Sequence, residues 1–237
     1  EGYYIIKGDP RGIRIISSSK QLIGKAKGFS KGESGMEASS LKGGNIVTTI
    51  DYRVQFMVET LLAQNIKRVE AQSGQVIVMD VHTGEIISMA NFPYFNPNEY
   101  HLADPVYLKN SCIVDVFEPG SIFKVITYAA ALEEQVVTPG MMIDVPESLM
   151  IAGWPITEAH ERMPDDPDRY SAQDILVKSM NVGTTILAKR MGKSAFYDYI
   201  TRFGFGGRSN VYLPGETMGL LRSLDTVTAI DNAVMSF

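Results

Sequence analysis

The sequence has few of the residues that build covalent or metal-bound frameworks. Its 237 residues include one cysteine and three histidines. The lone Cys112 excludes an internal disulfide and any multi-cysteine metal site. The histidines are scattered and lack the spacing of metal ligands. We therefore expect neither a metal ion nor a cofactor.

Long apolar runs and an excess of positive charge are also missing. No stretch approaches the about 18–20 consecutive apolar residues of a membrane span. The net charge is −5, and without a basic stripe this argues against nucleic-acid binding. The chain starts at Glu1 without a signal-peptide pattern and stops in an apolar run at Phe237. We expect an excised or processed piece, which leaves room for a membrane anchor upstream.

Two regions differ in composition. Short β-prone runs at 3–6 and 12–16 precede residues 17–44, which are rich in Ser, Gly and Lys. We expect a small β piece and linker, the remnant of a pedestal, over residues 1–45. The main domain then covers residues 46–237.

The main domain begins with a helix followed by a hairpin. From Asp51 onward the apolar residues follow a helical period, and either Thr49 or Asp51 can cap its start. Two β-rich runs at 75–81 and 85–90 flank a turn and predict an antiparallel hairpin. A helix laid across such a hairpin indicates an α+β fold.

Helices and short strands alternate in the remainder. The single tryptophan, Trp154, fits either the core or its rim. A break at the Ser-Met-Asn-Val-Gly run precedes the helix that we place from Thr184. The predicted elements are helices over 125–135, 171–178, 184–191 and 193–203, strands and loops over 136–170, and a final helix or strand from about Leu224.

A Ser-x-x-Lys string lies where a Pro-Gly break meets the helix predicted at 125–135. Residues 118–124 read Glu-Pro-Gly-Ser-Ile-Phe-Lys. Ser121 and Lys124 project from the same side of a helix. Free N–H groups and the helix dipole there favour an alkoxide. Because the helix is apolar on most sides, burial should lower the pKa of the lysine toward neutrality, which a base needs.

This string alone has an ordinary alternative, a Pro-Gly turn before a common helix. Ser-x-x-Lys also occurs at Ser17 and Ser39. The triplet Ser179-Met180-Asn181 is the only Ser-x-Asn in the chain, and by itself it fits helix punctuation. Together, the two motifs match the signature of penicillin-binding proteins and class A β-lactamases.

The sequence resembles the class B penicillin-binding proteins, the monofunctional peptidoglycan D,D-transpeptidases. The resemblance covers residues from about 45 to 237, and the motifs follow the order of the family. The matching stretches are Thr-Thr-Ile-Asp with Gln55 and Glu59, then 80–90, 93–98, 118–124, 213–221 and the final Met-Ser-Phe.

The resemblance implies a fold and a site. The fold is the α+β transpeptidase fold of penicillin-binding proteins and serine β-lactamases, an antiparallel sheet with helices. Ser121 would attack the D-Ala–D-Ala carbonyl of a stem peptide, and Lys124 would take its proton. Ser179 and Asn181 would relay protons and bind the substrate amide. β-Lactams would acylate the same serine.

One departure concerns the third family motif. No Lys-Thr-Gly or Lys-Ser-Gly occurs in the chain. The resemblance therefore implies a fold that is incomplete at its C-terminal end, with an unpaired apolar sheet edge over residues 75–91. We expect this chain alone to be inactive.

The resemblance also implies partners and leaves alternatives. It suggests the extracytoplasmic face of the bacterial cytoplasmic membrane, an anchor upstream, a membrane glycosyltransferase, and divisome or elongasome proteins. Whether the role is division, elongation or sporulation stays open. A β-lactamase or penicillin sensor of the same fold is one alternative, and a non-catalytic scaffold is another.

Overall fold

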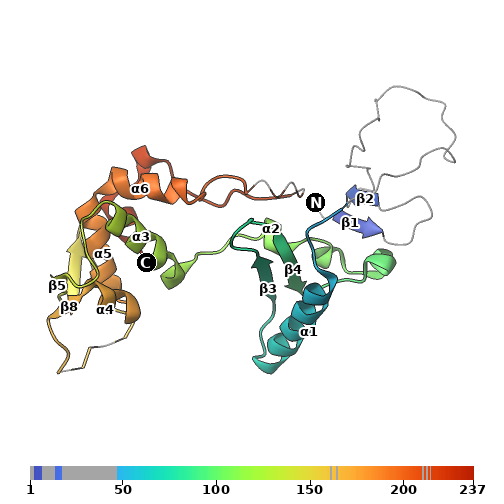
Figure 1. Cartoon of the computed structure of the whole chain (residues 1–237), viewed down its shortest axis with the longest axis horizontal. Coiled ribbons are helices and arrows are strands. Elements are labelled where there is room, and N and C mark those ends of the chain that lie inside the picture. The colour runs from blue at the N-terminus through green and yellow to red at the C-terminus, as the bar shows by residue number, and fades with distance from the viewer. Residues whose placement is uncertain are drawn as a thin grey trace. The chain divides into compact units, whose positions relative to one another are not determined.

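The computed structural model describes residues 3–6, 14–17, 47–160, 162–163, 165–209, 211, 213 and 215–237 (Figure 1). The chain divides into two compact units. The first combines Glu1–Asp115 with Asn210–Thr217, and the second combines Val116–Ser209 with Met218–Phe237.

Two short strands open the first unit. β1 (Tyr3–Ile6) and β2 (Arg14–Ser17) pair antiparallel, with Tyr3 opposite Ser17 and Ile6 opposite Arg14. The β-prone runs of the sequence therefore form strands, although the second strand begins two residues later than expected. Apart from Ser17, the linker predicted over residues 17–44 lies outside the described residues.

A helix packed on a hairpin forms the body of the first unit. α1 (Tyr52–Arg68) lies against β3 (Gly74–Met79) and β4 (Ile86–Phe92), which pair antiparallel (Figure 1). The carboxylate of Asp51 caps α1, accepting hydrogen bonds from the N–H groups of Arg53 at 2.8 Å and Val54 at 3.1 Å. The helix and the hairpin predicted from the sequence are both confirmed.

Gln55 joins α1 to β4 through its side-chain amide. Its Oε1 accepts hydrogen bonds from Ser88 Oγ and from the N–H of Met89, both at 2.8 Å. Its Nε2 donates to the carbonyl of Met89 at 2.9 Å and to Glu59 Oε1 at 2.7 Å. Gln55, held in turn by Glu59, therefore fixes α1 on β4. Both residues belong to the stretch that resembles the family.

The first unit continues through short helical turns. These are η2 (Pro97–Leu102), η3 (Pro105–Tyr107) and α2 (Ser111–Val114). The end of the family-like stretch at 93–98 is therefore helical. The thiol of Cys112 in α2 donates a hydrogen bond to the carbonyl of Ala90 in β4 at 3.3 Å.

Helix α5 (Asn181–Met191) is the centre of the second unit. Its side chains are buried on most sides, Leu187 and Ala188 completely. Its neighbours in space are α3, α4, α6 and α7. They run over Lys124–Glu133, Ala172–Val177, Lys193–Arg202 and Ala229–Val234 (Figure 1).

Two small two-stranded sheets lie between α3 and α4 in the sequence, the second of them a hairpin. β5 (Met142–Asp144) pairs with β8 (Arg169–Ser171), and β6 (Ser148–Ile151) pairs with β7 (Trp154–Thr157), both antiparallel. The prediction of short strands and loops here is confirmed. Trp154 is 65% exposed, so it does not belong to the core.

The predicted break before α5 is wrong in position. The helix begins at Asn181 rather than at Thr184, and Gly183 lies inside it. A Cβ at Gly183 would lie 2.4 Å from Ile175 Cγ2 of α4. The glycine therefore serves the close approach of two helices and does not interrupt either of them.

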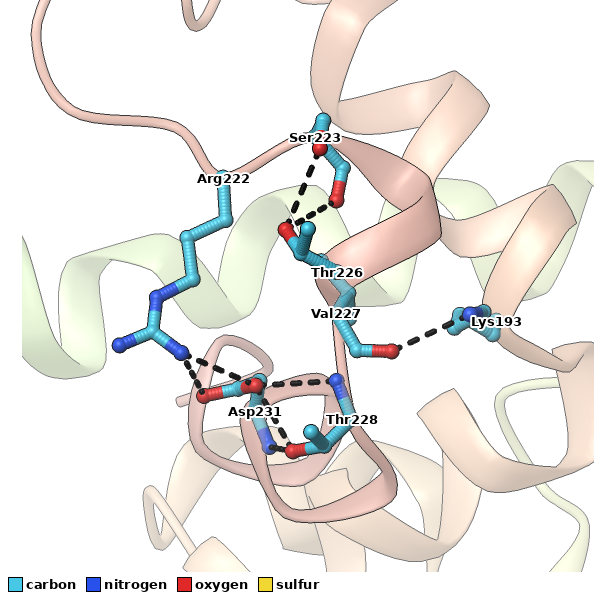
Figure 2. Close-up of polar contacts among 7 residues, drawn as sticks. All are labelled: Lys193, Arg222, Ser223, Thr226, Val227, Thr228 and Asp231. Carbon is cyan, nitrogen blue, oxygen red and sulfur yellow. Dashed lines mark hydrogen bonds and ion pairs between the residues drawn. The ribbon is translucent and has the colours of Figure 1, made fainter.

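The last helix is held by polar contacts (Figure 2). Asp231 accepts the N–H of Thr228 at 2.9 Å, and its own N–H donates to Thr228 Oγ1 at 3.2 Å, a capping box for α7. Arg222 Nη1 donates to Asp231 Oδ1 at 3.1 Å. Lys193 at the start of α6 donates to the carbonyl of Val227 at 3.1 Å. This end of the chain is thereby fixed to the helical core.

Among the helices in the described part of the chain, none combines the length and the apolar composition needed to cross a membrane.

Candidate active site

Ser121 lies in a single 3₁₀ turn, η4 (Gly120–Phe123), which runs directly into α3. The turn starts at Gly120 with φ +59°, a conformation that glycine adopts without strain. The ring of Phe123 anchors this turn by packing edge-on against Phe196 and Phe205, with ring centroids 6.5 and 5.0 Å apart. Ser121 is exposed, and within the described residues its hydroxyl has no hydrogen-bond partner. The predicted helix tip is thus a 3₁₀ turn, with the serine facing out.

Lys124 is the first residue of α3 and is only 1% exposed. Its Nζ donates to the carbonyl of Ser179 at 2.5 Å, to Ser179 Oγ at 3.1 Å and to Asn181 Oδ1 at 2.7 Å. Its ammonium also lies 5.9 Å from the ring centroid of Phe237. The structure therefore brings Lys124 together with Ser179 and Asn181, which lie 55 and 57 residues further along the sequence.

The environment of Lys124 lowers the pKa of its ammonium. Burial is the main cause, because a charged group loses its hydration in the interior. The carboxylate of Glu158 acts in the opposite direction and favours the charged form. The lowering expected from the sequence is confirmed in direction, and it suits a lysine that must accept a proton.

The Ser179–Asn181 turn has a conformation that aims both polar groups at the lysine. Ser179 has φ +54°, and a non-glycine residue in this region costs about 1 kcal/mol or more. In return, both its carbonyl and its hydroxyl reach Lys124. Asn181 follows as the first residue of α5, with its Nδ2 donating to the carbonyl of Thr157 at 3.1 Å.

Glu158 is a site residue that the sequence analysis missed. Its Oε2 accepts the N–H of Asn181 at 2.5 Å and its Oε1 accepts the N–H of Val182 at 3.1 Å. The sequence held one indirect sign, since Met180 stands at the N-cap position of α5 and has no acceptor in its side chain. The missing acceptor at Met180 does not identify the distant residue that caps the helix.

Across the described residues, no group of His, Cys, Asp and Glu side chains has an arrangement that would hold a metal ion.

Comparison with known protein families identifies the family of this chain. The family model described as the penicillin binding protein transpeptidase domain matches residues 74–237. The chain belongs to this family. The matched stretch includes every residue of the penicillin-binding site predicted from the sequence.

Two curated relatives are similar over most of this penicillin-binding protein chain. The penicillin-binding protein PbpB of Mycolicibacterium smegmatis is 35% identical over 78% of the chain and 28% of the relative. The peptidoglycan D,D-transpeptidase FtsI of Escherichia coli is 35% identical over 81% of the chain and 32% of the relative. The chain thus spans about a third, or less, of the length of these relatives.

A solved structure has the same fold. Penicillin-binding protein 3 of Mycobacterium tuberculosis, in complex with aztreonam, superposes with a TM-score of 0.72 at 32% identity, over 78% of this chain and 41% of that one. The expected α+β transpeptidase fold is confirmed.

Proposed function

We propose that this chain carries the catalytic serine of a peptidoglycan D,D-transpeptidase. The observation that carries the proposal is the state of Lys124, buried and hydrogen-bonded to Ser179 and Asn181 one turn after an exposed Ser121. A serine hydroxyl that is open to substrate, on the same helix start as a lysine of lowered pKa, suits a serine nucleophile with a lysine base. The curated relatives named D,D-transpeptidases support the same reaction.

In the proposed acylation, Ser121 Oγ attacks the carbonyl of the D-Ala–D-Ala bond. Its proton passes to the neutral amine of Lys124. The N–H of Ser121 lies in the first turn, where N–H groups lack intrahelical partners, and it supplies one donor to the oxyanion. The C–N bond then breaks, and the departing D-Ala amine takes the proton with the help of Ser179. The product is a peptidyl ester on Ser121.

The second half-reaction forms the cross-link. The amine of a neighbouring stem peptide attacks the ester carbonyl and loses a proton to Lys124. Ser121 Oγ leaves as the ester C–O bond breaks, and it takes this proton back from Lys124. Asn181, fixed between Lys124 and Thr157, binds the amide of the donor peptide. A β-lactam follows the same first step, because its ring amide takes the place of the D-Ala–D-Ala bond.

Labelling with a fluorescent penicillin tests the proposal. We expect the full-length native protein to be labelled with a stable, stoichiometric adduct on the peptide that contains Ser121. Ser121→Ala should abolish the adduct. Ser39→Ala, which changes the serine of another Ser-x-x-Lys string, should leave it unchanged. Labelling that survives Ser121→Ala would refute the nucleophile, and rapid turnover of the β-lactam would indicate a β-lactamase instead.

The setting of the protein is part of the same proposal and rests on the family resemblance. The substrate places it at the extracytoplasmic face of the bacterial cytoplasmic membrane, with a membrane glycosyltransferase that supplies the glycan strands. Divisome or elongasome proteins would be its further partners. Cross-linking in cells followed by identification of the partners tests this, and recovery of neither class would contradict it.

A further inference from the structure

Helix α5 starts at a site residue without a cap from its own sequence. Asn181 is its first residue, and Met180 before it makes no side-chain cap. The first N–H groups of a helix have no intrahelical partner, and a carboxylate suits both these donors and the positive end of the helix dipole. Glu158 supplies it from the residue that follows β7. Its two oxygens accept the N–H groups of Asn181 and Val182 at 2.5 and 3.1 Å.

The same strand end also orients the side chain of Asn181. The carbonyl of Thr157 accepts a hydrogen bond from Asn181 Nδ2 at 3.1 Å. With the nitrogen of the amide held there, Oδ1 faces Lys124 Nζ at 2.7 Å. Residues 157 and 158 therefore fix both the backbone and the side chain of Asn181.

Glu158 also acts on the charge of Lys124. It is half-buried, and it is the charged group that raises the pKa of the lysine against the lowering caused by burial. The carboxylate thus acts on Lys124 in two ways, by position through Asn181 and by its own negative charge.

We propose that Glu158 is a positioning residue, whose carboxylate holds the start of α5, and with it Asn181, against the ammonium of Lys124. The proposal rests on the proposed function only in that Lys124 is taken to be the base for Ser121. Its structural part can be tested without any activity.

Glu158→Gln is the central variant. A glutamine keeps one acceptor oxygen, but it turns an NH₂ group toward the other N–H of the helix start and removes the charge. Glu158→Asp keeps the charge on a shorter side chain. Glu147→Gln is the matched control, because Glu147 is exposed and makes no hydrogen bond or ion pair within the described residues.

The first experiment follows resonances of this chain by NMR, the amide protons as the pH is lowered and the lysine side chain as the pH is raised. We expect the amide resonances of Asn181 and Val182 to change together with pH, because both N–H groups donate to the same carboxylate. The shift should vanish in Glu158→Gln and persist in Glu147→Gln. In the same samples, the Cε resonance of Lys124 should report a lower pKa for the lysine in Glu158→Gln than in the wild type and in Glu147→Gln. Amide and lysine titrations that do not respond to Glu158→Gln would overturn the proposal.

The second experiment measures penicillin acylation by the full-length protein against pH. We expect Glu158→Gln to slow acylation about 10- to 100-fold, the range for a misplaced site group. The rising limb of the pH profile should move to lower pH. Glu158→Asp should restore part of the acylation rate and return the rising limb most of the way to its wild-type pH. A slower rate with an unmoved limb would indicate a merely structural role and contradict the proposal. If the native protein is not acylated at all, the proposed function fails, and the NMR titrations still decide the role of Glu158.

Discussion

Gln55 pairs with Met89 as a residue of a neighbouring strand would. Its side-chain amide accepts the N–H of Met89 at 2.8 Å and donates to the carbonyl of the same residue at 2.9 Å. A third bond comes from Ser88, whose side chain is fully buried. One side chain of α1 thus satisfies both backbone groups of Met89 in β4.

Replacing Gln55 should therefore destabilise the first unit. Gln55→Leu keeps the size of the side chain but leaves three polar groups of β4 without partners. We expect a loss of about 2–3 kcal/mol in the free energy of unfolding. Urea titration followed by circular dichroism measures it. Gln64→Leu is the control, because Gln64 is exposed on the same helix and should change stability by less than about 0.5 kcal/mol. Equal effects of the two substitutions would contradict the role of Gln55.

The pH dependence of stability should carry the signature of Lys124. Its pKa in the folded chain lies below its ordinary value of 10.5. Below the lowered pKa, both states hold the proton and the folded state bears the full penalty of a buried charge. As the pH rises from that pKa toward 10.5, the folded state has lost its proton while the unfolded state keeps it. The wild-type chain should therefore gain stability relative to Lys124→Met, by at most about 1.4 kcal/mol per pH unit.

Urea titrations of the two proteins at a series of alkaline pH values provide this difference. Buried tyrosines such as Tyr128, whose pKa is raised by burial, occur in both proteins and cancel. A difference that stays flat or falls with rising pH would show that Lys124 is not held in a site that disfavours its charge.

Gly183→Ala should force α4 and α5 apart. The added methyl group would lie 2.4 Å from Ile175 Cγ2, and Ile175 is itself fully buried. Overpacking of this kind costs about 1–3 kcal/mol, which thermal unfolding should show as a lower midpoint. Gly140→Ala is the matched control, because nothing lies within 4 Å of a Cβ there. If both substitutions lower the midpoint equally, the close approach of α4 and α5 is not the reason that position 183 requires a glycine.

The fluorescence of Trp154 should be that of a hydrated indole. It is the only tryptophan of the chain and is 65% exposed at the end of the β6–β7 hairpin. We expect its emission to resemble that of N-acetyltryptophanamide in water and to shift little on unfolding in urea. Trp154→Phe should change the free energy of unfolding by less than about 0.5 kcal/mol. A blue-shifted emission that moves to longer wavelength on unfolding would place Trp154 in an apolar contact.

Local patterns sufficed for the elements whose signals are local. α1 was predictable because Asp51 caps a regular apolar period. The β3–β4 hairpin was predictable because two β-rich runs flank a turn. The start of α5 was not, because its cap comes from Glu158 and its glycine serves contact with Ile175. Both of these causes lie outside the helix in sequence.

The sequence by itself determined the chemistry that the site can use. The exposed Ser121 and the lysine three residues later are set by one local string, and the family motifs around it are specific in kind and order. The tertiary structure decided what activates them. Only folding buries Lys124, lowers its pKa and brings Ser179, Asn181 and Glu158 around it, because hydrogen bonds and desolvation depend on distances that sequence spacing does not specify.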